Sequence, residues 1–190
     1  MSDRKNITAA LGKLLEKDRF SGTGKYWAKE VTFDYGQPSP IRVDYMQFKP
    51  HNQLAIDGIE KGEFICYEVK SCKEDFYSGF GLNFISEKNY LVMTMETYND
   101  LKNSHQIDKL PHFVGILVPI PKKMKYASEQ KKYDLTQIGE FSKEKDLNDW
   151  YLENIKPAKK TYRKRPMTEM LFCMLRSSIN NTKGENNSEL

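Results

Sequence analysis

The sequence has few of the residues that build disulfide-linked or zinc-bound proteins. Its 190 residues include only three cysteines and three histidines. Cys66, Cys72 and Cys173 are odd in number and show neither a CxxC nor a Cys/His ligand spacing. This pattern argues against both a disulfide framework and a structural zinc site. We therefore expect the thiols to be reduced.

Long apolar runs are also missing, and the charge is nearly balanced. No stretch approaches the roughly 20 apolar residues needed to cross a bilayer, and the polar opening MSDRKN differs from a secretory signal peptide. We expect a cytoplasmic protein with no membrane partner. A net charge of +4 is too small to indicate nucleic-acid binding by itself.

The composition that is present suits one soluble globular domain. Hydrophobic residues make up 38% of the chain and charged residues 29%, and the length fits a single core. We expect a domain over residues 1–155, followed by a basic segment and a C-terminal helix packed on it over 156–180. Residues 181–190 are polar and are expected to be a disordered tail.

The hydrophobic periodicity of the first half predicts a helix followed by a three-strand meander. Residues 7–15 carry apolar side chains at helical spacing. Residues 28–35 and 41–48 read as strands of a hairpin around GQPSP, and residues 63–70 as a third strand. After Lys70, Ser71 and Glu74 form the pattern of a capping box, which predicts a helix through about Ser78.

The second half predicts parallel strands joined by a helix. Residues 89–95 and 113–120 are short apolar runs separated by the helix-like 96–103, as in buried strands with crossovers. Residues 146–155 and 167–179 are predicted to be further helices. The fold class expected is α/β, a mixed sheet of a meander plus crossover strands, flanked by helices.

One strand of the meander carries charged residues where a chemical site could form. In residues 63–70 the two-residue period places Glu68 and Lys70 on the same face. If the strands at 41–48 and 63–70 pair, Asp44 can approach Glu68. Two convergent carboxylates are the oxygen ligands that Mg²⁺ or Mn²⁺ prefers. Lys70 could orient or deprotonate an attacking water, or act as a fixed cation beside a phosphate.

This arrangement resembles a known family. An aspartate in IRVDYM, then a Glu-x-Lys in CYEVKS followed by a helix, is similar to the PD-(D/E)XK (restriction-endonuclease-like) nuclease superfamily. Within that superfamily it resembles small bacterial DNA-repair-associated members. The resemblance implies metal ligation by Asp44, Glu68 and the carbonyl of Val69, with Lys70 as the catalytic lysine. It also implies an acidic residue from the first part of the core, which we match to Glu30. No proline precedes Asp44, unlike the fuller family pattern.

Two other patterns compete with these assignments. Asp57 also precedes the Glu-x-Lys, but the Gly58 that follows it favours a turn residue. A second Glu-x-Lys, Glu129-Gln130-Lys131, lies in a polar stretch without a strand pattern or an aspartate-bearing neighbour. We therefore keep Asp44, Glu68 and Lys70 as the candidate site.

A short basic run could contact nucleic acid. It is the sequence KPAKKTYRKRP, and the candidate phosphate-binding residues are Lys156, Lys159, Lys160, Arg163, Lys164 and Arg165. The same run could equally be a solvated linker. The apolar helix at 167–179 could be core or a homodimer contact.

The hypothesis from the sequence is a Mg²⁺- or Mn²⁺-dependent nuclease that cleaves DNA in repair, restriction or phage and mobile-element DNA metabolism. The alternative is a catalytically inactive module on the same fold that binds nucleic acid or protein. RNA is not excluded as the partner, because nothing in the sequence reads a 2′-hydroxyl.

Overall fold

The computed structural model of the chain describes residues 2–124, 141 and 147–186. The second Glu-x-Lys, at 129–131, lies outside these residues. The strands are β1 (Tyr26–Phe33), β2 (Ile41–Lys49), β3 (Glu63–Lys70), β4 (Lys88–Met93), β5 (Gly115–Pro121) and β6 (Trp150–Lys156). The α-helices are α1 (Ser2–Leu15), α2 (Ile56–Glu60), α3 (Lys73–Tyr77), α4 (Met95–Asn103) and α5 (Met167–Asn186). Short 3₁₀ or π turns are η1 (Glu16–Phe20), η2 (Ile107–Lys109), η3 (Lys122–Met124) and η7 (Leu147–Asp149).

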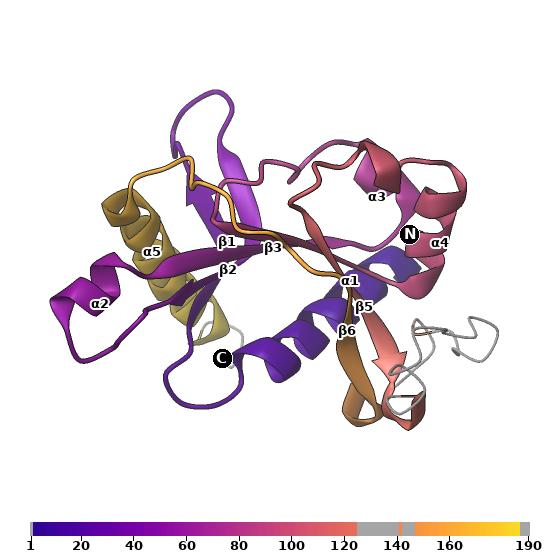
Figure 1. Ribbon diagram of the computed structural model, residues 1–190, viewed down its shortest axis with the longest axis horizontal. Helices are drawn as coiled ribbons and strands as arrows, with labels where there is room; N and C mark the ends of the chain where they lie inside the picture. Colours follow the sequence, from indigo (N-terminus) through magenta and orange to yellow (C-terminus); the bar gives the residue numbers. More distant parts are fainter. Residues whose placement is uncertain (1, 125–140, 142–146, 187–190) are drawn as a thin grey trace.

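The six strands form one mixed sheet in the order β1-β2-β3-β4-β5-β6 (Figure 1). β1, β2 and β3 pair antiparallel, which confirms the predicted meander. β3, β4 and β5 pair in parallel, and the predicted helix α4 connects β4 to β5. The prediction of an α/β fold with a mixed sheet flanked by helices is therefore confirmed.

Helices cover both faces of the sheet. On one face, α1 buries Leu11, Leu14 and Leu15 against side chains of the central strands and of β6. On the other face, α5 packs on the β1–β3 end and α4 on the β4–β5 end. Figure 1 shows α5 at one end of the sheet and α3 and α4 at the other. The sheet face between these two groups of helices carries the candidate site.

Residues 150–156 form a strand, so the helix predicted over 146–155 is wrong. Trp150 and Leu152 point to the α1 side of the sheet, while Tyr151 and Ile155 pack on the opposite side. The apolar residues thus follow the two-residue period of a strand. They pair antiparallel with β5, whose outer edge would otherwise lack hydrogen-bond partners.

The capping box predicted after Lys70 does not form, although the helix does. Cys72 occupies the N-cap of α3 and makes no side-chain cap hydrogen bond. Glu74 pairs with Arg4 of α1 at 2.9 Å instead. The Ser71 N–H donates to Asp75 at 3.3 Å, so the acidic residue at the next position takes a role that we assigned to Glu74.

The C-terminal helix is part of the fold's own core. Its Met170, Cys173 and Met174 are buried against β1, β2 and β3. Phe172 and Leu175 remain exposed on its outer side, so contact with a second copy stays a prediction. The helix continues to Asn186, into the segment where we expected a disordered tail. No helix in the described part of the chain has the length and apolar character to span a membrane.

Candidate active site

Asp44 and Glu68 meet across neighbouring strands. The register of β2 and β3 pairs Tyr45 with Tyr67, so the next antiparallel positions bring Asp44 opposite Glu68. Asp44 Oδ2 accepts the backbone N–H of Val69 at 2.8 Å, and the Asp44 carboxyl is near enough to Glu68 to raise the pKa of Glu68. The structure thus brings together the two acidic groups that the sequence analysis paired.

Lys70 lies in the same cavity as the two carboxyls. A cavity of about 660 Å³ is lined by Asp44, Glu68 and Lys70, together with Arg42 and Asn83 among others. The neighbours Tyr67 and Val69 pack on the α1 side, so Glu68 and Lys70 face the opposite side, between α5 and α3. The two-residue period of β3 therefore places both charged side chains where the sheet is not covered by a helix.

Burial and like charge dominate the electrostatics of the carboxyl pair. Glu68 is only 5% exposed. Burial and the nearby charge of Asp44 raise the pKa of Glu68 to about 10. Burial also raises the pKa of Asp44, although the Val69 N–H and Lys70 act in the other direction. Two neighbouring carboxyls with little exposure favour a proton or a cation between them.

The ammonium group of Lys70 is held in place by oxygen atoms. Lys70 is 4% exposed, and its Nζ donates to the carbonyl oxygen of Phe80 at 2.6 Å. The same Nζ lies 3.9 Å from Asp75 Oδ1. Both partners come from residues that follow β3, so this segment fixes the lysine beside the carboxyl pair.

The loop that contains Phe80 lines the cavity, and a glycine in it allows a close approach to Glu68. Gly81 has φ of +77°, and a Cβ atom there would collide with the Glu68 carboxylate. Gly79 has a similar φ of +71° but open space around its Cα. Only a residue without a side chain lets the chain pass this close to Glu68. The pair of glycines in SGFGLN is the sequence signal that could have identified this loop.

Replacing Gly81 by alanine is expected to destabilise the protein by roughly 2–3 kcal/mol, because it adds a steric overlap with Glu68 to the strain of positive φ. Gly79→Ala carries the backbone strain alone and should cost only about 1 kcal/mol. Thermal unfolding of both variants measures the difference. Equal losses of stability for Gly79→Ala and Gly81→Ala would contradict the close approach of the loop to Glu68.

Glu30, matched to the family's additional acidic residue, does not line the cavity. The register of β1 and β2 places it opposite Asp44, since Lys29 pairs with Tyr45 and Val31 with Val43. Its backbone is left-handed, with φ of +57°. Its carboxylate lies 3.4 Å from Arg42 Nη1 and is more than half exposed.

Asp57 is not among the residues that line the cavity. It belongs to α2, and its carboxylate pairs with Lys61 at 2.8 Å on the surface. The structure therefore supports Asp44 as the partner of Glu68, and Asp57 as a residue of a short connecting helix.

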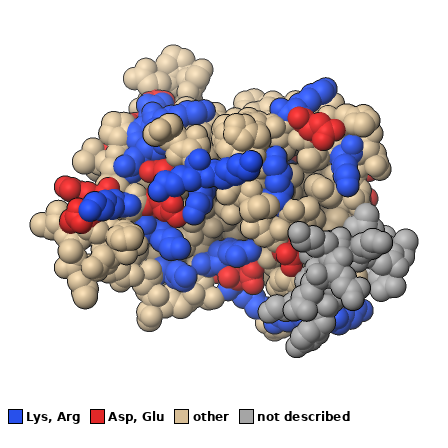
Figure 2. All heavy atoms as spheres, viewed as in Figure 1, with Lys and Arg blue, Asp and Glu red and all other residues tan. Residues whose placement is uncertain are grey.

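The basic segment, residues 156–165, docks on the protein through its backbone. The N–H groups of Lys159, Thr161 and Lys164 donate to the carbonyl oxygens of Phe113, Glu87 and Ile85 respectively. Figure 2 shows Lys and Arg side chains in a band across the face over which this segment runs in Figure 1. The segment is thus an ordered part of the surface.

Half of the six candidate phosphate-binding residues form ion pairs within the chain. These pairs are Lys160 with Glu63 at 3.6 Å, Arg163 with Glu87 at 3.4 Å, and Arg165 with Asp34 and Glu169. Lys164 donates to the carbonyl of Asn83 at 2.8 Å, which places it at the edge of the cavity. Lys156, Lys159 and Lys164 have no carboxylate within ion-pair distance in the described part of the chain.

The donor set fits a hard divalent cation. Asp44 and Glu68 offer oxygen atoms, and the Val69 carbonyl lies on the same side of the strand as the N–H bonded to Asp44, beyond the last ladder pair. Across residues 2–124, 141 and 147–186, no cluster of three or more His, Cys, Asp or Glu side chains forms a metal site. An ion here would therefore take two carboxylates from the protein and its other ligands from backbone, water or substrate, as Mg²⁺ commonly does.

Comparison with models of known protein families, with curated proteins and with solved structures gives no match.

Proposed function

We propose that this chain is a divalent-metal-dependent nuclease of the PD-(D/E)XK type that hydrolyses phosphodiester bonds in DNA. The observation that carries the proposal is that the Asp44 and Glu68 carboxyls, from neighbouring strands, line one cavity together with Lys70. These three side chains come from adjacent strands of a meander, as the resemblance implies. The order of a helix, three antiparallel strands, a helix and a parallel strand also supports it.

The roles of the residues follow from their positions. Asp44, Glu68 and the Val69 carbonyl would hold Mg²⁺ or Mn²⁺. A bound ion of this kind neutralises charge on a phosphate and lowers the pKa of water. Lys70 has its Nζ fixed by the Phe80 carbonyl and Asp75, and its remaining donor capacity is available to a phosphate oxygen or to the attacking water.

Cations near the mouth of the cavity suit a polyanionic substrate. Arg42 lines the cavity, is more than half exposed and makes a loose 3.4 Å contact with Glu30. Lys164 donates to the carbonyl of Asn83, which also lines the cavity. These two residues, from β2 and the basic segment, could contact phosphates on either side of the cleaved bond. The carboxylates alone would repel DNA, so the flanking cations support the same assignment.

The test combines metal binding with cleavage. We expect wild-type protein to bind Mn²⁺ by calorimetry and to cut linear and circular DNA only when Mg²⁺ or Mn²⁺ is added. Asp44→Ala should lose both properties, because it removes one of two carboxylate ligands. Asp57→Ala removes an exposed carboxylate and should retain both.

Each alternative outcome has a defined meaning. DNA binding without Mn²⁺ binding or cleavage, in wild type and Asp44→Ala alike, would reject the enzyme and favour the inactive binding module. If RNA is cleaved in a metal-dependent reaction and DNA is left uncut, the proposed metal site stands and the substrate is RNA instead of DNA. Cleavage that persists in chelator would contradict the proposal at its central point.

A further inference from the structure

A second cavity lies on the other face of the sheet. It has a volume of about 520 Å³, within the range of small-molecule sites. Tyr67 lines this cavity, whereas its neighbour Glu68 lines the first one. Alternation along β3 therefore separates the two cavities by the thickness of the sheet. The second cavity is not part of the carboxylate site.

The floor of the second cavity is aromatic and apolar. It is formed by Ile65 and Tyr67 of β3, Tyr90 of β4 and Leu117 of β5. The rings of Tyr67 and Tyr90 stack with centroids 5.6 Å apart. A floor of this kind favours a flat, weakly polar ring system over a sugar or a hydrated ion.

The rim carries an excess of positive charge. Four cationic residues line the cavity, namely Arg19, Lys25, Lys49 and Lys88, against the single carboxylate of Asp18. Lys88 pairs with Glu63 at 2.8 Å. No carboxylate lies within ion-pair distance of Lys25 or Lys49 in the described part of the chain. Arg19 lies 3.6 Å from Asp18, so two of the four rim cations, Lys25 and Lys49, are available to an anion without breaking an ion pair.

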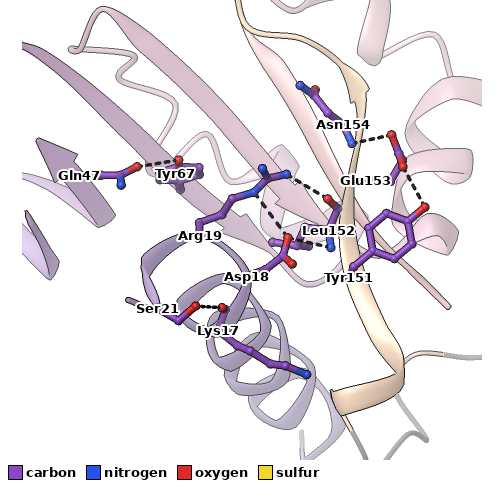
Figure 3. A network of polar contacts seen from close by, with 10 residues as sticks. All are labelled: Lys17, Asp18, Arg19, Ser21, Gln47, Tyr67, Tyr151, Leu152, Glu153 and Asn154. Atoms are coloured by element: carbon purple, nitrogen blue, oxygen red, sulfur yellow. Dashed lines mark hydrogen bonds and ion pairs between the residues drawn. The ribbon is translucent and has the colours of Figure 1, made fainter. Parts of the chain in front are cut away.

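Arg19 and Asp18 are fixed at this rim by β6 (Figure 3). Asp18 Oδ2 accepts the Leu152 N–H at 3.2 Å, and Arg19 Nη2 donates to the Leu152 carbonyl at 3.0 Å. Arg19 Nε is buried and has no hydrogen-bond acceptor, although Asp18 lies 3.6 Å away. Both residues belong to the π turn η1 (Glu16–Phe20), an irregularity that often accompanies functional sites.

The side-chain amide of Gln47 has a hydrogen-bond partner at its oxygen but none at its nitrogen within the described residues. Gln47 is 8% exposed and lines the cavity. Its Oε1 accepts the Tyr67 hydroxyl at 3.2 Å, as Figure 3 shows. Its Nε2 has no acceptor within the described residues, which leaves two donors for a ligand. A hydrogen-bonding group thus lies between the aromatic floor and the cationic rim.

We propose that this cavity binds a mononucleotide, with its base on the Tyr67–Tyr90 floor and its phosphate at Arg19, Lys25 and Lys49. Each part of that ligand has a matching surface: a π-face for the base, amide donors for its polar edge and cations for the phosphate. A simple anion would use only the rim, and a nucleoside only the floor. The proposal is independent of nuclease activity, because it concerns the opposite face of the sheet.

Calorimetry with AMP, GMP, CMP and UMP tests the proposal, with inorganic phosphate and adenosine as single-part probes. We expect at least one mononucleotide to bind at least tenfold more tightly than either probe. The double variant Lys25→Gln/Lys49→Gln should weaken nucleotide binding about tenfold or more and leave adenosine binding unchanged. Lys109→Gln removes an exposed charge elsewhere and should have no effect.

A second variant tests the floor. Tyr90→Leu keeps an apolar side chain but removes one ring, and should weaken nucleotide and adenosine binding while leaving that of phosphate unchanged. Phosphate that binds as tightly as every nucleotide, the absence of binding by any mononucleotide, or an effect of Lys109→Gln equal to that of the double variant would each overturn the proposal.

Discussion

Glu68→Ala is expected to lower kcat/KM for metal-dependent DNA cleavage at least about a thousandfold, equivalent to about 4 kcal/mol of transition-state stabilisation. Glu68 supplies one of the two carboxylates that meet in the cavity, so its removal leaves too few ligands to hold a divalent ion. Rates measured on a defined duplex with saturating Mg²⁺ check the effect, and circular dichroism confirms that the variant is folded.

Lys70→Ala should cause a similar loss of rate by a different route. The lysine contacts the Phe80 carbonyl and lies near Asp75, and neither contact is needed for the carboxylates to bind metal. Mn²⁺ affinity should therefore be retained in Lys70→Ala and lost in Glu68→Ala. Asp57→Ala, on the surface helix α2, is the matched control and should cleave at the wild-type rate. Undiminished cleavage by Glu68→Ala and Lys70→Ala would reject the proposed active site.

The part of the site predicted from the sequence depends on short-range regularities. A two-residue period fixes Glu68 and Lys70 on one face of β3, and antiparallel pairing of neighbouring segments brings Asp44 opposite Glu68. Both rules act within the two neighbouring strands β2 and β3. They hold here because β2 and β3 keep a regular register up to the pair Tyr45–Tyr67.

The parts that were missed depend on contacts between distant segments. Residues 150–156 become a strand because the edge of β5 is available to them, whereas the apolar spacing of residues 147–155 also suits one face of a helix. The sequence left the basic segment open between a phosphate-binding surface and a solvated linker, and it could not show that Asp34, Glu63 and Glu87, all distant in sequence, pair with three of its cations. Glu30 is opposite Asp44 in register, has a left-handed backbone, pairs with Arg42 at 3.4 Å and is not among the residues that line the cavity.

Metal-free Glu68→Gln is expected to be more stable than the wild type at pH 8, by roughly 1–3 kcal/mol or about 2–12 °C in Tm. In the folded chain the pKa of Glu68 is raised to about 10, against an ordinary value of 4.5. Between these values the folded state holds a proton that the unfolded state has released, so wild-type stability falls as the pH rises from about 5 to 10. Glutamine carries no titrating group there, and its neutral amide can donate to Asp44.

The pH dependence separates this effect from a general change in packing. Near pH 4.5 and below, the carboxyl is protonated in both states, and the difference between Glu68→Gln and wild type should shrink toward zero. Added Mn²⁺ should reverse the order at pH 8, because the ion replaces the proton between the carboxylates of the wild type and raises its Tm, while Glu68→Gln lacks the second anionic ligand. Asp57→Asn alters a carboxylate that is exposed and should show neither effect. A difference between Glu68→Gln and wild type that stays constant from pH 4 to 9 would show that the buried carboxyl pair is not the source of the instability, and with it the electrostatic reason for a cation in this cavity would be lost.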